Sequence, residues 1–154
     1  GYFHDPKQVF IVLEKCARGH LYSELCKQGA LPQPRAASYL AQIARALRYC
    51  HARGVVHRDL KPENVFIAHV HHPETKNLHL HVKIGDMGLA TRDVRGTDKG
   101  FAGTGGYIAP GLYRWWDGTV DDYNEKCDVW SIGMIFCDLL MPPLFCCLPL
   151  PVPP

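Results

Sequence analysis

The sequence predicts an α+β fold in which helices dominate and strands occur in short pairs. Residues 40–50 place apolar side chains at helical spacing, and residues 127–141 are apolar nearly all round, which is typical of a helix inside a core. Between these helices, residues 78–84 alternate apolar and polar side chains, as a half-buried strand does. These three segments carry the assignment of the fold class.

The N-terminal part of the chain adds a pair of strands and the start of the helical region. Residues 9–13 are a continuous apolar run that suits a buried strand, and a second strand precedes it. A helix over residues 20–27 is expected to stop at Gly29. Pro34 fits the first turn of the longer helix, which Gly54 ends.

The rest of the chain divides into a strand, a long loop and a tail. Residues 65–67 predict a short strand, followed by a loop that leads to the alternating strand. Residues 85–123 are rich in Gly, Asp and Thr and show no period, so they predict one long ordered loop. Loops of that length in compact domains are usually functional. Residues 142–154 are Pro-rich and carry no folding signal.

Composition and charge narrow the class of protein. The formal net charge of +2 is too small to indicate nucleic acid or a membrane surface as a partner. Seven cysteines without CxxC pairs, and no secretory leader at Gly1, favour reduced thiols in an intracellular protein of the cytoplasm or nucleus. Residues 132–152 are mostly apolar, but Asp138 and four prolines exclude a membrane-spanning helix there.

Residues 57–64 read His-Arg-Asp-Leu-Lys-Pro-Glu-Asn and carry the strongest chemical signal. In this segment, between a helix and a strand, Asp59 can accept a hydroxyl proton and orient the attacking oxygen. Lys61 can neutralise a transferred phosphoryl group, and Asn64 can ligate a metal ion. The alternative is a charged turn without chemistry, but so many matching positions make chance agreement remote.

Residues 86–88 read Asp-Met-Gly and end the alternating strand, 22 residues beyond Asn64. A carboxylate at Asp86 can bind Mg²⁺ that bridges the phosphates of ATP, and Gly88 lets the chain turn. On its own, Asp-x-Gly is most often a plain turn. Its spacing from residues 57–64 makes a second metal ligand the stronger interpretation.

Together these motifs resemble those of eukaryotic serine/threonine protein kinases, and the resemblance covers about residues 1–141. Residues 57–64 look like the HRDxKxxN catalytic loop, and residues 86–88 look like the DFG motif with Met in place of Phe. Residues 1–67 are most similar to the Aurora group, whereas the activation segment is more similar to the AGC branch. The resemblance therefore implies a family without selecting a subfamily.

The activation segment provides the third motif. Residues 103–111 resemble the kinase GTxxYxAPE segment, with Gly111 in place of Glu. The resemblance implies that Thr104 contacts Asp59 and Lys61 and helps to seat a Ser/Thr substrate. In the family the replaced Glu pairs with an Arg far downstream, so Gly111 is expected to loosen the segment.

The resemblance also implies structural roles around the catalytic loop. Asp128 is expected to anchor that loop by hydrogen bonds. His57 and Arg58 are expected to have structural roles within the loop. An Arg at the position of Arg58 often pairs with a phosphate on the activation loop, and Thr97 is the hydroxyl residue in the middle of that loop. The alternative for Thr97 is an ordinary turn threonine.

A nucleotide site follows from the same resemblance. Leu13 falls at the gatekeeper position, the backbone at Glu14 and Cys16 is expected to hydrogen-bond adenine, and Phe66 is expected to form the floor beneath it. The residues implied for ATP binding are Leu13, Glu14, Cys16, Glu63, Asn64, Phe66 and Asp86, and those implied for Mg²⁺ are Asn64 and Asp86.

The implied fold is protein-kinase-like: a mainly helical large lobe with a two-strand remnant of the small lobe, truncated at both ends. Residues 1–16 would be the small-lobe strands and hinge, residues 17–141 the large lobe, and residues 142–154 a tail unlike kinases. No Gly-rich loop or strand Lys that orients ATP phosphates precedes Gly1. The fragment alone is therefore expected to be inactive.

The implied function is ATP-dependent phosphorylation of Ser/Thr residues in protein substrates by the complete kinase. The alternative is an inactive kinase fragment, or a pseudokinase-like module that binds nucleotide or partners. A small-molecule kinase comes third, because Lys61 and residues 103–110 both serve a peptide hydroxyl. No nucleic-acid partner is implied, and the oligomeric state stays open.

Two further patterns have structural interpretations. Trp115 and Trp116 are expected to pack a loop onto the large lobe. A group of histidines crowds one hairpin and permits a zinc site in principle, but without an acidic or Cys partner at a defined spacing a solvated polar face is expected. These histidines are His69, His71, His72, His79 and His81.

Overall fold

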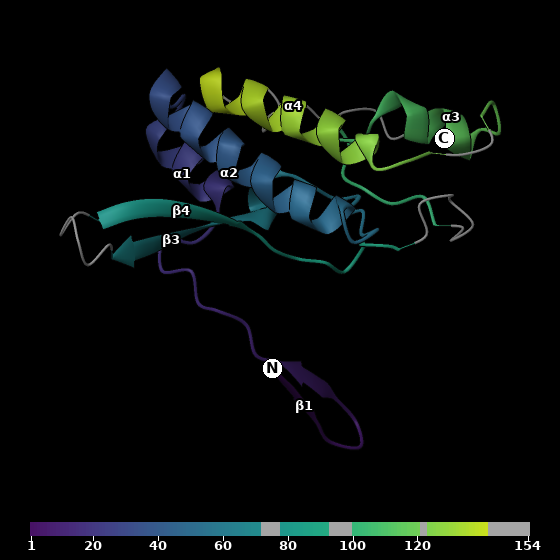
Figure 1. Ribbon diagram of the computed structural model, residues 1–154, viewed down its shortest axis with the longest axis horizontal. Helices are drawn as coiled ribbons and strands as arrows, with labels where there is room; N and C mark the ends of the chain where they lie inside the picture. The colour runs from purple at the N-terminus through teal and green to yellow at the C-terminus, as the bar shows by residue number, and fades with distance from the viewer. Residues whose placement is uncertain (72–77, 93–99, 121–122, 142–154) are drawn as a thin grey trace.

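The computed structural model describes residues 1–71, 78–92, 100–120 and 123–141. Within them two antiparallel strand pairs accompany a helical layer (Figure 1). Strand β1 (Tyr2–His4) pairs with β2 (Val9–Ile11), and β3 (Val65–His71) pairs with β4 (Leu78–Ile84). The helices are α1 (Leu21–Gln28), α2 (Gln33–His51), the 3-10 helix η1 (Pro62–Asn64), α3 (Pro110–Trp116) and α4 (Lys126–Leu140). The predicted α+β fold is confirmed.

Local sequence explains where α1 and α2 begin and end. The ring of His20 accepts a hydrogen bond from the backbone N–H of Ser23 and caps α1. Gly29 ends α1 with a positive φ of 69°, and Gly54 has φ 67° just beyond α2. Pro34 lies in the first turn of α2, where a missing N–H costs nothing.

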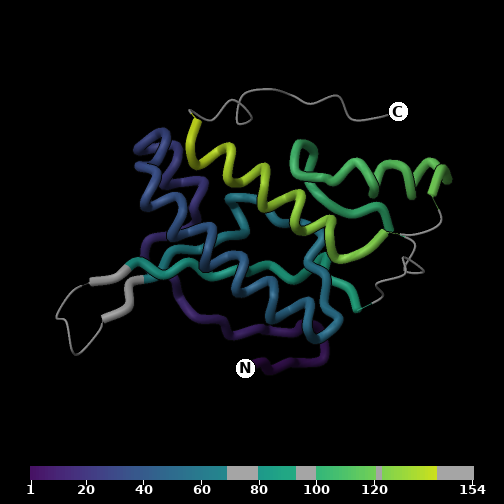
Figure 2. Tube along the Cα trace, turned by 45° about the horizontal axis from the view of Figure 1, so that its top comes forward, coloured from purple at the N-terminus to yellow at the C-terminus, as the bar shows by residue number. Residues whose placement is uncertain are grey.

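Helix α2 lies at the centre of the molecule, between α4 and the β3–β4 pair, and α1 packs against β3 and η1. Figure 2 shows α2 and α4 side by side in a second view. The main core joins these elements; it contains Leu21, Leu25, Leu31, Ala36, Tyr39, Ile43, Leu47, Leu60, Val65, Ile67, Val82, Ile135 and Leu139. This core includes Leu60, which lies in the loop between α2 and η1, so the loop is anchored to the core.

The side chain of Gln42 connects α2 to the outer edge of β4. Its amide nitrogen donates to the carbonyl of Leu80 over 3.4 Å, and its amide oxygen accepts from the N–H of Val82 over 3.0 Å. A single helix residue therefore pairs with β4 much as a neighbouring strand would.

Part of the predicted loop over residues 85–123 is wrong, because residues 110–116 form α3. Pro110 occupies the first turn of α3. Leu112 is buried in a second core with Val56, Tyr123 and other residues. The helix therefore depends on contacts with residues distant in sequence. Strand β3 also runs four residues further than predicted, to His71.

Helix α4 differs from the prediction in its surroundings rather than its position. One face is buried, with Asp128, Ile135 and Leu139 at 0% exposure, but Val129 and Trp130 on another face are 56% and 45% exposed. None of the helices in the described ranges is long and apolar enough to cross a membrane.

The β1–β2 hairpin stands away from the helical layer (Figure 1). The prediction of a buried strand over residues 9–13 is wrong, because Val9, Ile11 and Leu13 are 68%, 70% and 78% exposed. The two strands of the hairpin pack on each other, with Phe3 and Phe10 stacked at 4.8 Å between ring centroids. The chain rejoins the core where Ile67 donates a backbone hydrogen bond to Gly19.

Candidate active site

The buried carboxylate of Asp128, in the first turn of α4, holds the loop that follows α2. Its two oxygens accept hydrogen bonds from the backbone N–H groups of His57 and Arg58, each over 2.9 Å. The Nε2 atom of His51 lies 2.8 Å from the same carboxylate. Asp128 is fully buried, and Arg58 has an unusual φ of 68°. The carboxylate thus stabilises a backbone conformation that L-residues rarely adopt.

The buried ring of His57 connects this loop to the segment that carries Asp86. Its Nε2 atom lies 3.0 Å from the carbonyl oxygen of Gly85, and its Nδ1 atom accepts from the N–H of Asp59 over 3.3 Å. Both contacts are satisfied by the neutral tautomer with the proton on Nε2. The two predicted chemical segments are therefore held in fixed relation.

Three side chains converge on the carboxylate of Asp59, whose side chain is only 10% exposed. The hydroxyl of Thr104 donates to Oδ1 over 2.6 Å, and the ammonium of Lys61 lies 3.1 Å from Oδ2. Lys61 also donates to the Thr104 hydroxyl over 2.6 Å. The structure thus brings Thr104 from the activation segment to Asp59 and Lys61 of the catalytic loop.

The amide of Asn64 completes this group. Its nitrogen donates to the backbone oxygen of Asp59 over 2.8 Å and to Oδ2 over 3.2 Å. The amide nitrogen of Asn64 therefore faces Asp59. An amide oxygen and the carboxylate of Asp86 are the hard oxygen donors that Mg²⁺ prefers. The residues present therefore fit a magnesium ion.

Asp86 begins the turn after β4 with φ 55°, and its side chain accepts from the N–H of Gly88 over 3.2 Å. It is exposed, unlike Asp59 and Asn64. Gly85, just before it, packs against the ring of Phe66, where an added Cβ would approach to 2.7 Å of a ring carbon. Any side chain at Gly85 would displace that ring.

A cavity of about 450 Å³ lies between the segment after β2 and the β3–β4 pair. Five residues predicted to bind nucleotide line it, namely Leu13, Glu14, Cys16, Phe66 and Asp86. The prediction missed Lys83, Ile84 and Gly85 in the same lining. Lys83 is the cross-strand partner of Phe66 and forms an ion pair with Glu14. The register of the two strands was the signal that could have identified Lys83.

Glu63 lies apart from that cavity, in η1. Its Oε2 atom is buried without a hydrogen-bond partner, as is the Oδ1 atom of Asp138 on α4. Burial raises the pKa of Asp138, a hydrogen bond from Tyr107 opposes this, and the charge of Glu63 adds to the rise. Glu63 therefore lies close enough to Asp138 of α4 for their charges to interact, and its predicted role in nucleotide binding stays a prediction.

Two contacts fix the activation segment on α4. The hydroxyl of Tyr107 donates to Asp138 over 2.6 Å, and the hydroxyl of Ser131 donates to the backbone oxygen of Tyr107 over 2.7 Å. Gly103, with φ 130°, lies so close to Ile108 that an added Cβ would come within 2.8 Å of it. These contacts hold in place the segment that carries Thr104.

Arg58 extends from the loop toward residues on both sides of the activation segment. Its Nε donates to the carbonyl of Leu89 over 2.7 Å, and its Nη1 donates to the hydroxyl of Tyr123 over 2.9 Å. Thr97, the predicted phosphate acceptor, lies outside the described residues. Its pairing with Arg58 stays a prediction.

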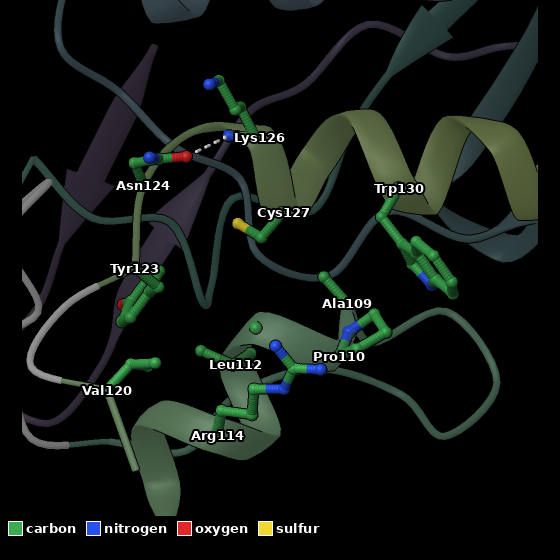
Figure 3. A pocket seen from close by; sticks show the side chains of 11 residues that line it. Ala109, Pro110, Leu112, Arg114, Val120, Tyr123, Asn124, Lys126, Cys127 and Trp130 are labelled. Atoms are coloured by element: carbon green, nitrogen blue, oxygen red, sulfur yellow. Dashed lines mark hydrogen bonds between the residues drawn. The ribbon is translucent and has the colours of Figure 1, made fainter. Parts of the chain in front are cut away.

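Beside α3 lies a hollow of about 330 Å³, which Gly111 helps to line (Figure 3). A Cβ at Gly111 would meet no atom within 4 Å, so a larger side chain fits there. Cys127 faces the same hollow, and burial raises the pKa of its thiol to about 12, which keeps it protonated. The open space beside Gly111 would therefore accommodate the Glu that the resemblance implies at this position.

Most of the histidine hairpin lies outside what the structure describes, so its predicted solvated polar face stays a prediction. The side chains of His69, His71, His72 and His79 lie outside the described part of the chain. Among the residues described, no cluster of three or more His, Cys, Asp or Glu side chains could hold a metal ion.

Comparison with known proteins agrees with this geometry. Residues 1–147 match the family described as "Protein kinase domain". The Aurora kinase of Dictyostelium discoideum is 36% identical over 141 residues, which are 92% of this chain and 33% of that protein. Aurora kinase B of Xenopus tropicalis is 35% identical over 93% of this chain and 36% of its own length.

A plant relative gives the same result. Serine/threonine-protein kinase Aurora-1 of Arabidopsis thaliana is 35% identical over 91% of this chain and 42% of its own length. The chain therefore spans between a third and about two fifths of the length of these relatives. With the family matched over nearly all its residues, the chain belongs to the protein kinase domain family.

Proposed function

We propose that this chain forms the catalytic part of a serine/threonine protein kinase that transfers the γ-phosphoryl group of ATP to protein hydroxyl groups. The observation that carries the proposal is the convergence of Lys61, Thr104 and Asn64 on the carboxylate of Asp59. Such a group can orient an attacking hydroxyl and balance the charge of a phosphoryl group in flight.

Each residue has a defined task in this transfer. The carboxylate of Asp59 accepts the hydrogen bond of the incoming Ser or Thr hydroxyl and takes its proton as the new O–P bond forms. Lys61 stabilises the negative charge on the transferred group, while the bond to the β-phosphate oxygen breaks and ADP leaves. Asn64 and Asp86 would hold Mg²⁺, which neutralises charge on the ATP phosphates.

The acceptor side of the site rests on Thr104. Thr104 donates to Asp59 and accepts from Lys61, each over 2.6 Å, and Lys61 also lies 3.1 Å from the Asp59 carboxylate, so the three groups hold one another in place. An acceptor hydroxyl that approaches Asp59 therefore meets a carboxylate already oriented by Thr104 and Asn64. Preorganisation of this kind lowers the cost of reaching the transition state.

The nucleotide side of the proposal rests on the cavity of about 450 Å³, whose lining includes Phe66, Cys16 and Asp86. Phe66 offers an apolar surface to adenine, and the backbone near Cys16 offers hydrogen bonds. Asp86, at the end of the same cavity lining, places a carboxylate where the phosphates would lie. We infer a protein substrate with a Ser or Thr acceptor, and an intracellular location for the kinase.

The test is phosphoryl transfer by the complete protein that carries this segment. Asp59→Asn keeps the shape of the side chain but removes its basicity, so transfer to a Ser/Thr peptide should fall about 10²–10⁴-fold. ATP affinity should stay nearly unchanged, because Asp59 does not line the nucleotide cavity. Asp117→Asn, on the surface at the end of α3, is the matched control.

Near-normal turnover by the Asp59→Asn variant would refute the assignment. Nucleotide binding by the unmodified protein without any transfer would instead support the alternative of a module that binds nucleotide or partners.

A further inference from the structure

An ion pair joins two sides of the cavity of about 450 Å³. Lys83 on β4 pairs with Glu14, which lies in the segment that follows β2, and both residues line the cavity. Lys83 and Phe66 are direct partners in the antiparallel β3–β4 pair, so their side chains project from the same face. The lysine that holds Glu14 therefore stands beside the aromatic ring that lines the same cavity.

The β3–β4 side of the cavity is fixed by close contacts. The backbone N–H of Gly85 donates to the carbonyl of Asn64 over 2.9 Å, and a Cβ at Gly85 would approach to 2.7 Å of the Phe66 ring. Val65 and Ile67, the neighbours of Phe66 in β3, are fully buried in the main core. This side of the cavity is therefore held by the core.

The opposite side of the cavity, which follows β2, has fewer attachments. Among the residues that the structure describes, the ion pair with Lys83 is the one hydrogen bond or ion pair that residues 13–15 make. The next attachment along the chain is at Arg18, whose backbone N–H donates to the carbonyl of Ile67 over 3.3 Å. Figure 1 shows this stretch as a single connection between the β1–β2 hairpin and the helical layer. The position of residues 13–15 therefore depends on Lys83.

We propose that Lys83 is a positioning residue for the nucleotide, which acts through Glu14 and holds residues 14–16 at the spacing from Phe66 that an adenine ring needs. The backbone at Glu14 and Cys16 is the part of the chain expected to hydrogen-bond adenine, and it can do so only at a fixed distance from the ring beneath. This inference rests on the proposed function, because it names a residue that shapes the nucleotide site of that function.

The exposure of the ion pair sets the size of its effect. The side chains of Lys83 and Glu14 are 41% and 60% exposed, so water and salt screen their attraction. Loss of an exposed pair should weaken nucleotide binding by about 2–5-fold. Because Asp59 does not line this cavity, the chemical step should be unaffected. KM for ATP should therefore rise while kcat stays nearly unchanged.

The experiment measures the binding of adenosine, and of ADP with Mg²⁺, to the complete protein that carries this segment, by titration calorimetry. The variants are Glu14→Gln, Lys83→Gln, the two combined, and the charge exchange of Glu14→Lys with Lys83→Glu. The exchange keeps the summed length of the two side chains. Lys15→Gln is the matched control, because it removes an exposed positive charge next to Glu14 without removing the pair.

Each single substitution should raise Kd for both ligands about 2–5-fold. The combined Gln variant should raise Kd no further, because the same pair is lost only once. The charge exchange should bring Kd back close to that of the unmodified protein, and Lys15→Gln should leave Kd unchanged. An increase in salt from about 10 mM to about 1 M should remove most of the difference between the unmodified protein and the single variants.

Single effects that multiply in the combined variant, or a charge exchange that restores nothing, would overturn the proposal. A change in ADP affinity alone would also overturn it, because Lys83 would then contact the phosphates directly. If all variants bind both ligands as the unmodified protein does, this inference fails and the proposed function stands. If the unmodified protein binds neither ligand, the nucleotide site of the proposed function fails together with it.

Discussion

Replacement of Asp128 by Ala should destabilise the fold more than any surface substitution. Asp128 is fully buried and accepts hydrogen bonds from two backbone N–H groups, those of His57 and Arg58. Its removal leaves both donors buried without a partner, and each such donor costs about 1–3 kcal/mol. His51 loses its contact as well. The expected loss is about 2–6 kcal/mol, against a total of about 5–15 kcal/mol for an ordinary domain.

The loss is measured by urea unfolding followed by circular dichroism. With a slope of about 1–3 kcal/mol per molar urea, the midpoint of Asp128→Ala should fall by at least about 0.7 M. The control is Asp117→Ala, which removes an exposed carboxylate that accepts a backbone hydrogen bond from Thr119 over 2.9 Å. Water replaces that bond, so the control should lose less than about 1 kcal/mol.

A difference below about 1 kcal/mol between the two variants would refute the reasoning. It would mean that the N–H groups of His57 and Arg58 find other partners when the carboxylate is absent. The positive φ of Arg58 would then need a different explanation.

Three further predictions follow from the site. Asp86→Ala should abolish magnesium-dependent nucleotide binding by the complete kinase, and equal ATP affinity with and without Mg²⁺ in both proteins would contradict this. Thr104→Ala should lower kcat/KM for a peptide about 10–100-fold, and Thr104→Ser should restore it. The reason is that the hydroxyl of Thr104, and not its methyl group, makes the hydrogen bonds with Asp59 and Lys61. Burial raises the pKa of Asp138, so its charge destabilises the fold as the pH rises through that pKa. Asp138→Asn should therefore melt higher than the unmodified chain at pH 7, with a gap that narrows toward pH 4; a constant gap would contradict this.

Local periodicity predicted the helices and strands whose apolar faces meet the core directly. Helix α1 and strand β4 begin and end within one residue of their predicted bounds. Helix α3 was missed because its stability comes from the burial of Leu112 against Val56 and Tyr123, and a local window contains neither partner. The exposed face of α4, which carries Val129 and Trp130, was missed because an apolar sequence does not reveal how many neighbours a helix has.

The candidate site shows the same division. The positions of Asp59, Lys61 and Asn64 relative to one another follow from a single motif, since eight consecutive residues leave little room for variation. The contact of Thr104 with Lys61 joins residues 43 positions apart, and only the family resemblance suggested it. Lys83 was placed on the polar face of a strand, and polar faces are usually solvated. Only the pairing with Phe66 shows that this face lines a cavity.

The pairing of Gln42 with β4 affects how this chain behaves at high concentration. Within the residues that the structure describes, the β3–β4 ribbon has two strands, and the edge of a ribbon is a template on which a foreign strand can add. Gln42 already occupies the carbonyl of Leu80 and the N–H of Val82, so an incoming strand must first displace a side chain held by a 19-residue helix. The middle of this edge is thereby protected against intermolecular strand addition, the first step toward aggregates.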